Sequence, residues 1–586
     1  MDLTALQDNL RNMGLHHARG ESEAAAVAMI NMLVELENKP IGITDGEKRL
    51  MGRAILQFAT LFCQPDFQIP PGLAFALLQH NCLISNLFAG CLGMTTDPFI
   101  ELVRGDPGEL YKTLVLYSGR NEAQFDIAKA MQINPSLVSQ WLYQSWKMNP
   151  TMMGSKKITG AMTHFLDQVN SQIQPAVDLN QLYFGCTYLG NDRERRIKEI
   201  LNQSIQRYAT RVIRNNPNPK KIGVFSDHLW KGHSVYRTLI HYIRSLKEQG
   251  GYHLTLMHAH PIPEKHRDTE VFDEVITFPW DGANLDISAI ASNEFAALVM
   301  PDVGMSLPSI IVANHRIAPV QVAMTGHPSS SFGACVDYFI SGKQVDLPPQ
   351  AHLTYGERLV MLPGYGAVHE KPTYQKRHPS KRTDHLVVNG SWSGPKVHWS
   401  FLGALSQVIE GSMRPLLFRI FSSAGPLRHK GGLPFIQQVD KQLQGCKKEV
   451  FGHLDYDEYM GLLEEADFAL DCFPFGGSNT VSDMLYLGIP VLCREGTRWF
   501  NRIGPAMLRS IGLDELIATT DSEYIKKAIR LANDEEYRSH LSGRIAAADL
   551  DTNVYTPRGA SEFRGFIDRV VANPRAYPGY EPIDLS

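Results

Sequence analysis

The stretch Asp471-Cys-Phe-Pro-Phe-Gly-Gly-Ser-Asn-Thr-Val-Ser-Asp483, followed by Met484-Leu-Tyr-Leu-Gly-Ile-Pro490, decides the fold of its region of the chain. Ahead of it, the apolar run 468–470 ends in an acid and predicts a buried parallel strand. Ser478 is a good helix N-cap, while Gly488 and Pro490 end the helix before another apolar run at 491–493. The stretch therefore predicts a strand, a glycine-containing loop, a helix and a second strand.

The predicted helix start is a candidate anion site. Its first N–H groups have no partner inside the helix, and the helix dipole adds partial positive charge. Small side chains at Gly476, Gly477 and Ser478 allow a phosphate to approach the backbone. Asn479 and Asp483 share one helix face, which places an acid one turn behind the phosphate, where ribose hydroxyls could bind. An ordinary strand-to-helix turn with a capped helix explains the same pattern, so both interpretations stay open.

Composition limits the class of protein. A chain of 586 residues suggests three or so domains. The net charge of −4 gives no electrostatic footprint for a nucleic acid, and no apolar run is long enough to span a membrane. The N-terminus lacks a secretory signal, and the eight cysteines form no Cys-x-x-Cys pair. We expect a cytoplasmic protein with buried free thiols and neither disulfides nor a zinc site.

The pattern divides the chain into four segments. Residues 1–214 show apolar residues at helical spacing without a 34-residue repeat, which predicts an all-α domain. Residues 215–384 and 385–554 alternate short apolar strands with amphipathic helices, which predicts two Rossmann-like lobes. Residues 555–586 are expected to form a helical segment that packs back on the first lobe. The predicted fold class is α/β, with two lobes preceded by an all-α domain.

Individual elements follow from the same patterns. In the first lobe, strands are predicted at 222–225, 253–257, 274–278, 295–300, 319–324 and 336–340, with helices at 235–248 and 307–315. In the second lobe, strands are predicted at 386–389, 415–421 and 449–451, with a helix at 395–410. Asp455, with Glu458 three positions on, predicts a capping box at the start of another helix.

Three side chains outside the opening stretch are candidates for chemistry, because each follows a predicted strand. Lys396 lies just after Pro395, which suits the first position of a helix, and would point toward a phosphate at the sheet edge. His453 follows a strand on the same edge, and His233 precedes a helix of the first lobe. A plain surface lysine is an equally good interpretation of Lys396.

A metal is not required by the sequence. His228 and His233 have no suitably spaced carboxylate or cysteine beside them, and Asp455-Tyr-Asp457 is explained by helix capping. Lys396 and the Ser478–Thr480 amides can neutralise a diphosphate leaving group instead. The loop Gly326-His-Pro-Ser-Ser-Ser331 could line a cleft or be a plain turn.

These residues resemble glycosyltransferase family 41. The stretch 477–483 with Leu487-Gly-Ile-Pro490 looks like the uridine-diphosphate loop and helix of the family, and Met324–Ser331 with Asp337-Tyr-Phe-Ile340 resembles a second signature. The chain is more similar to the bacterial cytoplasmic branch that modifies adhesins than to the eukaryote-type O-linked N-acetylglucosamine transferases. The latter carry tetratricopeptide arrays and read Gly-His-Thr-Thr, where this chain reads Gly-Ser-Asn-Thr.

The resemblance implies a GT-B fold and an inverting protein N-glycosyltransferase that needs no metal or other cofactor. It would move glucose from UDP-glucose to asparagine in Asn-x-Ser/Thr sequons of a protein acceptor such as a secreted adhesin. His233 and Lys396 would be catalytic. The nucleotide-sugar contacts would come from the second lobe: Ser393, Lys396, His453, Gly477, Ser478, Asn479, Thr480 and Asp483.

Three alternatives stay open. The chain could glycosylate serine or threonine instead, with UDP-N-acetylglucosamine or a UDP-hexose as donor. It could be a non-catalytic homologue whose helical domain holds partner proteins. It could also be a UDP-sugar epimerase, which likewise uses two Rossmann-like lobes.

Overall fold

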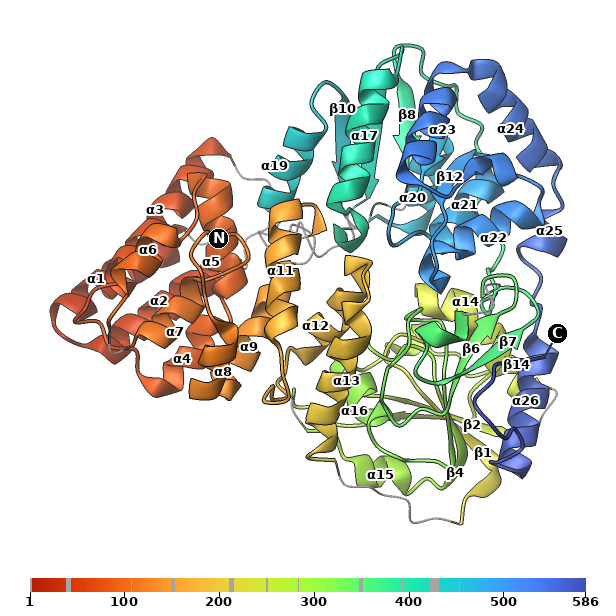
Figure 1. The fold of residues 1–586 in the computed structure, drawn as a ribbon, viewed down its shortest axis with the longest axis horizontal. Helices are drawn as coiled ribbons and strands as arrows, with labels where there is room; N and C mark the ends of the chain where they lie inside the picture. Colours follow the sequence, from red (N-terminus) through yellow and green to blue (C-terminus); the bar gives the residue numbers. More distant parts are fainter. Residues whose placement is uncertain are drawn as a thin grey trace. The chain divides into compact units, whose positions relative to one another are not determined.

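A computed structural model gives the fold (Figure 1). It describes residues 3–37, 44–106, 108–148, 153–209, 216–248, 251–282, 284–346, 351–390, 392, 394–421, 432–452 and 454–585. The chain divides into two compact units. The first contains Met1–Leu189, Trp392–Ile409 and Ile420–Leu454, and the second contains Gly190–Ser391, Glu410–Arg419 and Asp455–Ser586. The domain boundaries expected after residues 214, 384 and 554 stay predictions.

The N-terminal part of the first unit is built from helices, as predicted (Figure 1). They are α1 (Leu3–Ala18), α2 (Ser22–Glu37), α3 (Asp45–Phe62), α4 (Pro71–Leu78), α5 (Asn81–Leu87), α6 (Asp97–Leu102), α7 (Glu109–Leu116), α8 (Ile127–Ile133), α9 (Pro135–Ser145), α11 (Lys156–Gln168) and α12 (Leu179–Gly185). The unit also contains α17 (Trp399–Gly411), α19 (Gly432–Gln442) and strand β10 (Lys447–Phe451).

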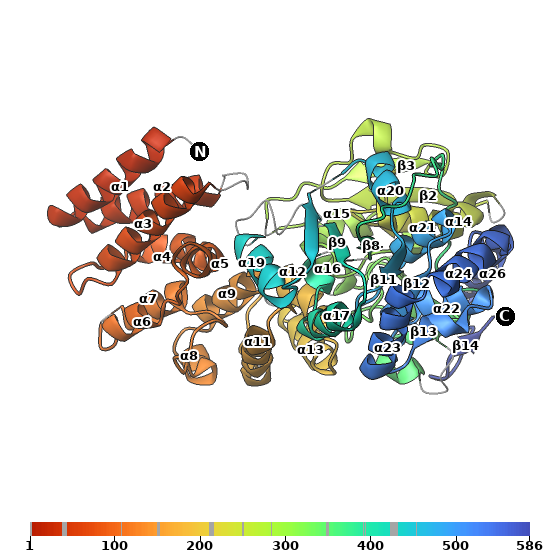
Figure 2. The same cartoon turned by 90° about the horizontal axis from the view of Figure 1, so that it is seen from above.

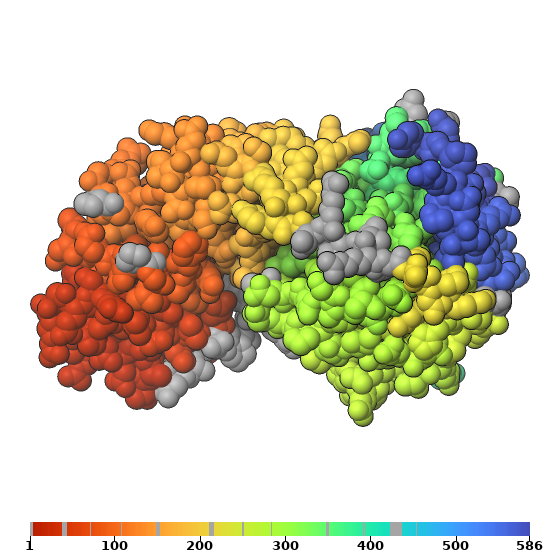
Figure 3. Space-filling model, turned by 90° about the horizontal axis from the view of Figure 1, so that it is seen from below, coloured from red at the N-terminus to blue at the C-terminus, as the bar shows by residue number. Residues whose placement is uncertain are grey.

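These helices pack mainly against helices near them in the chain. Helix α1 contacts α2 and α3, α4 contacts α2, α7 and α9, and α9 contacts α8 and α12 (Figure 2). In Figure 3 the residues of this part of the chain, coloured red to orange, form one continuous surface. No single helix in the described ranges is long and apolar enough to cross a membrane, although the bent pair Gly72–Leu78 and Asn81–Leu92 passes that test together by length and composition.

The second unit begins with α13 (Arg193–Gln206) and continues into an eight-stranded parallel sheet in the order β14-β7-β6-β5-β4-β1-β2-β3. The six strands predicted for the first lobe are confirmed. The strands are β1 (Asn218–Phe225), β2 (His253–His258), β3 (Glu274–Thr277), β4 (Phe295–Met300), β5 (Val320–Ala323), β6 (Tyr338–Gly342), β7 (Arg358–Leu362) and β14 (Ile583–Asp584). Register is set by pairs such as Val224 with Leu256 and Val224 with Val299.

Alternate residues of these strands face two separate layers of core. Val224 and Val299 pack on the face covered by α14 (Ser234–Glu248) and α26 (Ala560–Ala572). Phe225 and Met300 pack on the opposite face, against α15 (Ile287–Ala291) and α16 (Leu307–Ala313). Because side chains of a strand alternate between faces, both sides of the sheet are apolar and both carry helices, as doubly wound architecture requires.

The second sheet runs β9-β8-β11-β12-β13 within this unit and is also parallel. Its strands are β8 (Leu386–Asn389), β9 (Leu416–Phe421), β11 (Phe468–Leu470), β12 (Val491–Arg494) and β13 (Ile517–Ala518). The helices that follow are α20 (Tyr456–Glu464), α21 (Asn479–Leu487), α22 (Ile503–Ser510), α23 (Asp521–Asn533), α24 (Glu535–Ala547) and α25 (Leu550–Asn553). The opening stretch therefore folds as predicted, from β11 through α21 to β12.

Three local predictions differ from the structure. The helix expected from Pro395 begins at Trp399 instead, and the preceding Gly394–Lys396 forms a short 3₁₀ turn. Asp455 lies at the N-cap of α20 but its side chain makes no capping bond, so the predicted capping box is absent. Ser478 likewise lies at the N-cap of α21 without a side-chain cap, because its hydroxyl bonds elsewhere.

Candidate active site

The loop between β11 and α21 is folded over the last acid of the strand. Both carboxylate oxygens of Asp471 accept from the Gly477 N–H, at 2.8 and 3.0 Å. A Cβ at Gly476 would lie 2.8 Å from an oxygen of the same carboxylate, so the loop requires glycine there. The Gly477 amide is therefore engaged within the loop, while the amides that follow it start the helix.

The first turn of α21 carries polar groups without partners. Oδ1 of Asn479 and Oγ1 of Thr480 are buried, and neither has a hydrogen-bond partner among the residues that the structure describes. Among the described residues, the N–H groups of Val481 and Ser482 bond to the Ser478 carbonyl oxygen, whereas those of Asn479 and Thr480 make no backbone hydrogen bond. Buried polar groups in native proteins are normally paired, so this concentration indicates a place for a ligand.

The start of α14, in the first lobe, faces the start of α21. Nδ2 of Asn479 lies 3.5 Å from the carbonyl oxygen of Ser234, the first residue of α14. His233 immediately precedes that helix, and its Nδ1 accepts from the N–H of Val235 at 3.2 Å. Two helix N-termini, each with partial positive charge, thus meet at one point, which favours an anion between them.

One turn along each helix, a charged pair joins the two lobes. The Arg237 guanidinium of α14 donates to Oδ1 of Asp483 at 3.0 Å, and the Tyr456 hydroxyl donates to the same oxygen at 2.8 Å. Arg237 also lies over the Tyr456 ring, 4.9 Å from its centroid. Burial raises the pKa of Asp483, whereas the guanidinium acts in the opposite direction and favours the carboxylate. The acid predicted to bind ribose is therefore bonded to a first-lobe arginine in this structure.

His233 belongs to a small group of ionisable side chains. His228 lies beside it, with 5.1 Å between ring centroids, and Nδ1 of His228 is 2.6 Å from Oδ2 of Asp302. Burial lowers the pKa of His233 to about 4, and the neighbouring His228 adds to this effect. The pKa of His228 is raised: burial opposes the charged form, but the bond to Asp302 outweighs it. His233 is consequently neutral at physiological pH.

Side chains of α13 bond to the loop 326–331 and fix its conformation. Ser329 bonds to Glu194, whose Oε1 also accepts from Nζ of Lys198 at 2.7 Å, and Arg498 bonds to Oε2 of Glu194 at 2.8 Å. Burial alone would raise the pKa of Glu194, but these cations hold it far below its usual range. Burial also lowers the pKa of His327, in the same loop, to about 3. The loop is thus a packed, ion-paired turn rather than an open surface.

The structure brings together only part of the predicted site. His233, Ser478, Asn479, Thr480 and Asp483 lie at the two facing helix starts. Lys396 lies in the first unit, half-buried in its 3₁₀ turn. Ser393 and His453 lie outside the described residues.

Two residues of this site were not predicted from the sequence: Arg237, and His369, whose Nε2 lies 2.8 Å from Oγ of Ser478. Arg237 could have been noticed, because it lies four positions after His233 and so shares its helix face. His369 carries no such local signal.

As for a metal, no group of three or more His, Cys, Asp or Glu side chains is placed to hold one in the described parts of the chain.

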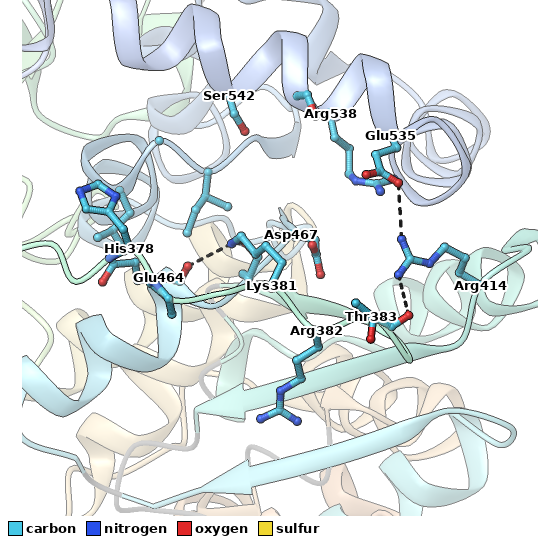
Figure 4. Close-up of a pocket in the computed structure, with 16 residues that line it drawn as sticks. His378, Lys381, Arg382, Thr383, Arg414, Glu464, Asp467, Glu535, Arg538 and Ser542 are labelled. Carbon is cyan, nitrogen blue, oxygen red and sulfur yellow. Dashed lines mark hydrogen bonds and ion pairs between the residues drawn. The ribbon is translucent and has the colours of Figure 1, made fainter.

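A pocket of about 750 Å³ lies at the opposite edge of the second sheet (Figure 4). It is lined by residues just before strands β8, β9, β11 and β12, among them Thr383, Arg414, Asp467 and Ile489. Two of its cations already bond to main-chain carbonyl oxygens. Lys381 donates to the carbonyls of Glu464 and Ala466, just before β11, and Arg414 donates to the Thr383 carbonyl. Ligands of open α/β sheets bind at the carboxyl ends of strands, so this pocket is not the candidate site.

One segment of the chain matches a known protein family. Residues 454–560 match the family described as Glycosyl transferase family 41. That match contains β11, the loop after it and α21 with Asp483, which are the elements that form the second-lobe side of the site. The prediction that the chain is a glycosyltransferase is confirmed.

Curated relatives extend the likeness over most of the chain. A protein named UDP-glucose:protein N-beta-glucosyltransferase, from Actinobacillus pleuropneumoniae serotype 5b, is 23% identical over 534 residues, which cover 83% of this chain and 84% of the relative. A Solanum lycopersicum protein named "Probable UDP-N-acetylglucosamine--peptide N-acetylglucosaminyltransferase SPINDLY" is 28% identical over 233 residues, 39% of this chain and 24% of that one. The predicted resemblance to glycosyltransferase family 41 is confirmed.

A solved structure supports the fold. A mutant of the O-GlcNAc transferase from Thermobaculum terrenum superimposes with a TM-score of 0.61 at 15% identity, covering 98% of this chain and 99% of that one. The fold class predicted from the sequence, GT-B with a helical N-terminal region, is confirmed.

Proposed function

We propose that this chain is an inverting, metal-independent protein N-glycosyltransferase. It transfers glucose from UDP-glucose to the side-chain amide of asparagine in Asn-x-Ser/Thr sequons of a protein acceptor, such as a secreted adhesin. The observation that carries the proposal is the meeting of two helix starts around unpaired polar groups of Asn479 and Thr480. The name of the Actinobacillus relative, which matches most of the chain, supports the donor and the linkage.

In this proposal the diphosphate lies at the start of α21. The free N–H groups of the first turn and the two helix dipoles stabilise its charge, which grows as the sugar leaves. The resemblance adds Lys396, Ser393 and His453 as further contacts, with Gly477 and Ser478 shaping the loop. Asp483 binds the ribose hydroxyls with the carboxylate oxygen that Arg237 and Tyr456 leave open.

The transfer replaces one bond at the anomeric carbon with another. The bond from that carbon to the diphosphate oxygen breaks, the bond to the amide nitrogen forms on the opposite face, and the nitrogen loses a proton to solvent or a base. Because Nδ1 of His233 accepts from the Val235 N–H, the single proton of the neutral ring lies on Nε2. His233 therefore suits the role of a hydrogen-bond donor that orients a substrate better than that of a base.

The test combines binding and product analysis. The protein is titrated with UDP by calorimetry, and an Asn-x-Thr peptide is incubated with UDP-glucose, UDP-galactose or UDP-N-acetylglucosamine. We expect UDP to bind, and one hexose to be added to the asparagine with UDP-glucose, located by fragmentation. An Asn→Gln peptide is the matched control. An unmodified peptide together with no UDP binding at millimolar concentration would refute the proposal.

Transfer to serine or threonine is the second candidate, because the SPINDLY relatives are named as peptide N-acetylglucosaminyltransferases. The same experiment separates the two functions. Modification of the Asn→Gln peptide at its threonine, with UDP-N-acetylglucosamine as the preferred donor, would favour the O-linked reaction.

A further inference from the structure

A buried histidine is bonded to the residue that starts α21. His369 lies in the segment that leads from β7 of the first sheet to β8 of the second, and its side chain is fully buried. Its Nε2 is 2.8 Å from Oγ of Ser478. Its Nδ1 is buried too and has no hydrogen-bond partner within the described ranges. Nothing in the proposed chemistry so far uses this residue.

The bond between His369 and Ser478 positions the serine hydroxyl and adds no charge to the site. Burial lowers the pKa of His369 to about 3, with the Arg237 cation adding to the effect, so the ring is neutral at physiological pH. A neutral imidazole at hydrogen-bonding distance fixes where the Ser478 hydroxyl points. It adds no cation that could attract a phosphate directly.

That orientation matters because Ser478 occupies the N-cap position. A serine there normally has extended backbone, and its hydroxyl accepts from the second or third N–H of the helix. Ser478 instead has φ −123° and ψ −83°, and its side chain makes no capping bond. Of the two N–H groups that such a cap would bind, that of Val481 bonds to the Ser478 carbonyl oxygen, and that of Thr480 makes no backbone hydrogen bond among the described residues. With the hydroxyl turned to His369, the Thr480 N–H stays available.

We propose that His369 is a positioning residue that holds Ser478 out of the N-cap conformation and so keeps the Thr480 N–H, at the start of α21, open for the diphosphate of the donor. This inference rests on the proposed function, because it assigns the open amide to that ligand. Without His369, the Ser478 hydroxyl would turn back and cap the helix in competition with the phosphate.

A double-mutant cycle on UDP affinity tests the coupling. His369→Phe keeps a ring of similar volume but removes the bond to Ser478. We expect it to weaken UDP binding about five-fold, the factor that corresponds to one typical N-cap interaction. In the Ser478→Ala background the same His369→Phe change should alter UDP affinity less than about two-fold, because no hydroxyl remains to cap the helix. His369→Gln, which restores a hydrogen-bonding group, should recover most of the loss.

Hydrogen exchange gives a second readout that a purely structural role would not produce. In ligand-free His369→Phe, amides at the start of α21 should exchange more slowly than in the unmodified protein, since they gain a cap. General destabilisation would make them exchange faster. His315→Ala, which removes another buried histidine of the first lobe, is the matched control and should leave both UDP affinity and this exchange unchanged.

The outcomes separate this inference from the proposed function. Unaltered UDP affinity in His369→Phe, an equal loss in both backgrounds, or faster exchange at α21 would overturn the role of His369 while leaving a UDP site in place. Absence of UDP binding in the unmodified protein would instead overturn the proposed function itself. If His369→Phe does not fold, the same cycle is run with His369→Ala.

Discussion

Asp483 shows how a single buried carboxylate can join two lobes. It lies on α21 of the second lobe, yet its bonds come from Tyr456 on α20 and from Arg237 on α14, 246 residues earlier in the chain. Charge-assisted hydrogen bonds of this kind contribute more than neutral ones, and leaving one partner buried alone is costly. The same carboxylate therefore has a structural role and a proposed ligand-binding role.

Replacing this acid separates the two roles. Asp483→Asn keeps the shape but removes the charge, and we expect UDP to bind about 10- to 100-fold more weakly, as the loss of a charge-assisted bond of about 1.5–3 kcal/mol implies. Calorimetric titration measures the change. Asp273→Asn, which removes an acid bonded to Lys247 far along the first sheet, should bind UDP normally. Equal UDP affinity in Asp483→Asn and the unmodified protein would contradict the assignment.

Burial of neutral histidines predicts sensitivity to acid. The pKa of His327 is about 3 in the fold, below the ordinary value near 6.5 in the unfolded chain. Between these values the unfolded chain binds the proton more readily, so stability falls as the pH is lowered from 6.5 toward 3. At pH 5 the cost from this residue is about 2 kcal/mol.

His327→Gln should therefore lose less stability between pH 7 and pH 5 than the unmodified protein does. Chemical denaturation at both pH values measures the difference. His540→Gln, at an exposed position of α24, is the control and should keep the full pH dependence. An identical pH dependence in His327→Gln would show that this ring does not contribute.

Helix α13 holds the loop 326–331 of the first lobe in place through buried charges. The side chains of Glu194 and Lys198 are 2% and 0% exposed, and Lys198 also donates to Ser329 and to the Ser330 carbonyl. Arg498, from the second lobe, shares the same glutamate. One element thus contacts both lobes through a single acid.

Replacing Glu194 alone should destabilise the protein more than replacing Glu194 and Lys198 together. Glu194→Gln leaves Lys198 buried without its counter-charge, and we expect a loss of about 3–5 kcal/mol in the free energy of unfolding. The double substitution Glu194→Met with Lys198→Met should cost less than the single one. Urea denaturation measures both. Glu199→Gln, in an exposed pair on the same helix, is the control at under about 1 kcal/mol.

How far the sequence predicts these elements depends on their length and surroundings. Buried strands such as 295–300 and 468–470 were predicted with their observed bounds, because uninterrupted apolar runs are a strong signal. Strand β14 has two residues, too few to show any period, and β7 is a short apolar run that fits a loop equally well. The helix after Lys396 starts late because Gly394–Lys396 turns as a 3₁₀ segment first.

The sequence predicted only those site residues that closely follow a predicted strand. Ser478, Asn479, Thr480 and Asp483 follow one strand, and His233 follows another, so the carboxyl-edge rule brings them to one place. The bonds of Arg237 to Asp483 and of His369 to Ser478 join residues 246 and 109 positions apart. A single sequence contains no signal for such pairings, since they depend on how the two lobes face each other.

The first lobe depends on residues more than two hundred positions later in the chain. Helix α26 places Phe563, Phe566, Ile567 and Val570 in the same core as strands β1 and β4, and none of these side chains is more than 1% exposed. Strand β14 then pairs with β7 at the edge of the sheet. The segment 555–586 is thus part of the first lobe's core and sheet.

Truncation after residue 555 should therefore unfold the first lobe. Burial of four such side chains contributes roughly 6–12 kcal/mol, which is similar to the net stability of a whole domain. Near-ultraviolet circular dichroism and limited trypsin digestion should show lost packing between residues 218 and 362. Truncation after residue 572, which keeps α26, is the control and should stay folded. A compact, protease-resistant first lobe in the shorter chain would contradict this dependence.

The position of α26 late in the sequence also affects folding during translation. The ribosome synthesises every residue of the second lobe before it reaches α26, which completes the core of the first lobe. The first lobe therefore stays incompletely packed while the second lobe is being synthesised. The nascent chain therefore exposes an unfinished apolar sheet face for the time needed to translate some two hundred residues, on the order of ten to forty seconds at ordinary elongation rates. Chaperone contact during synthesis should concentrate on that face.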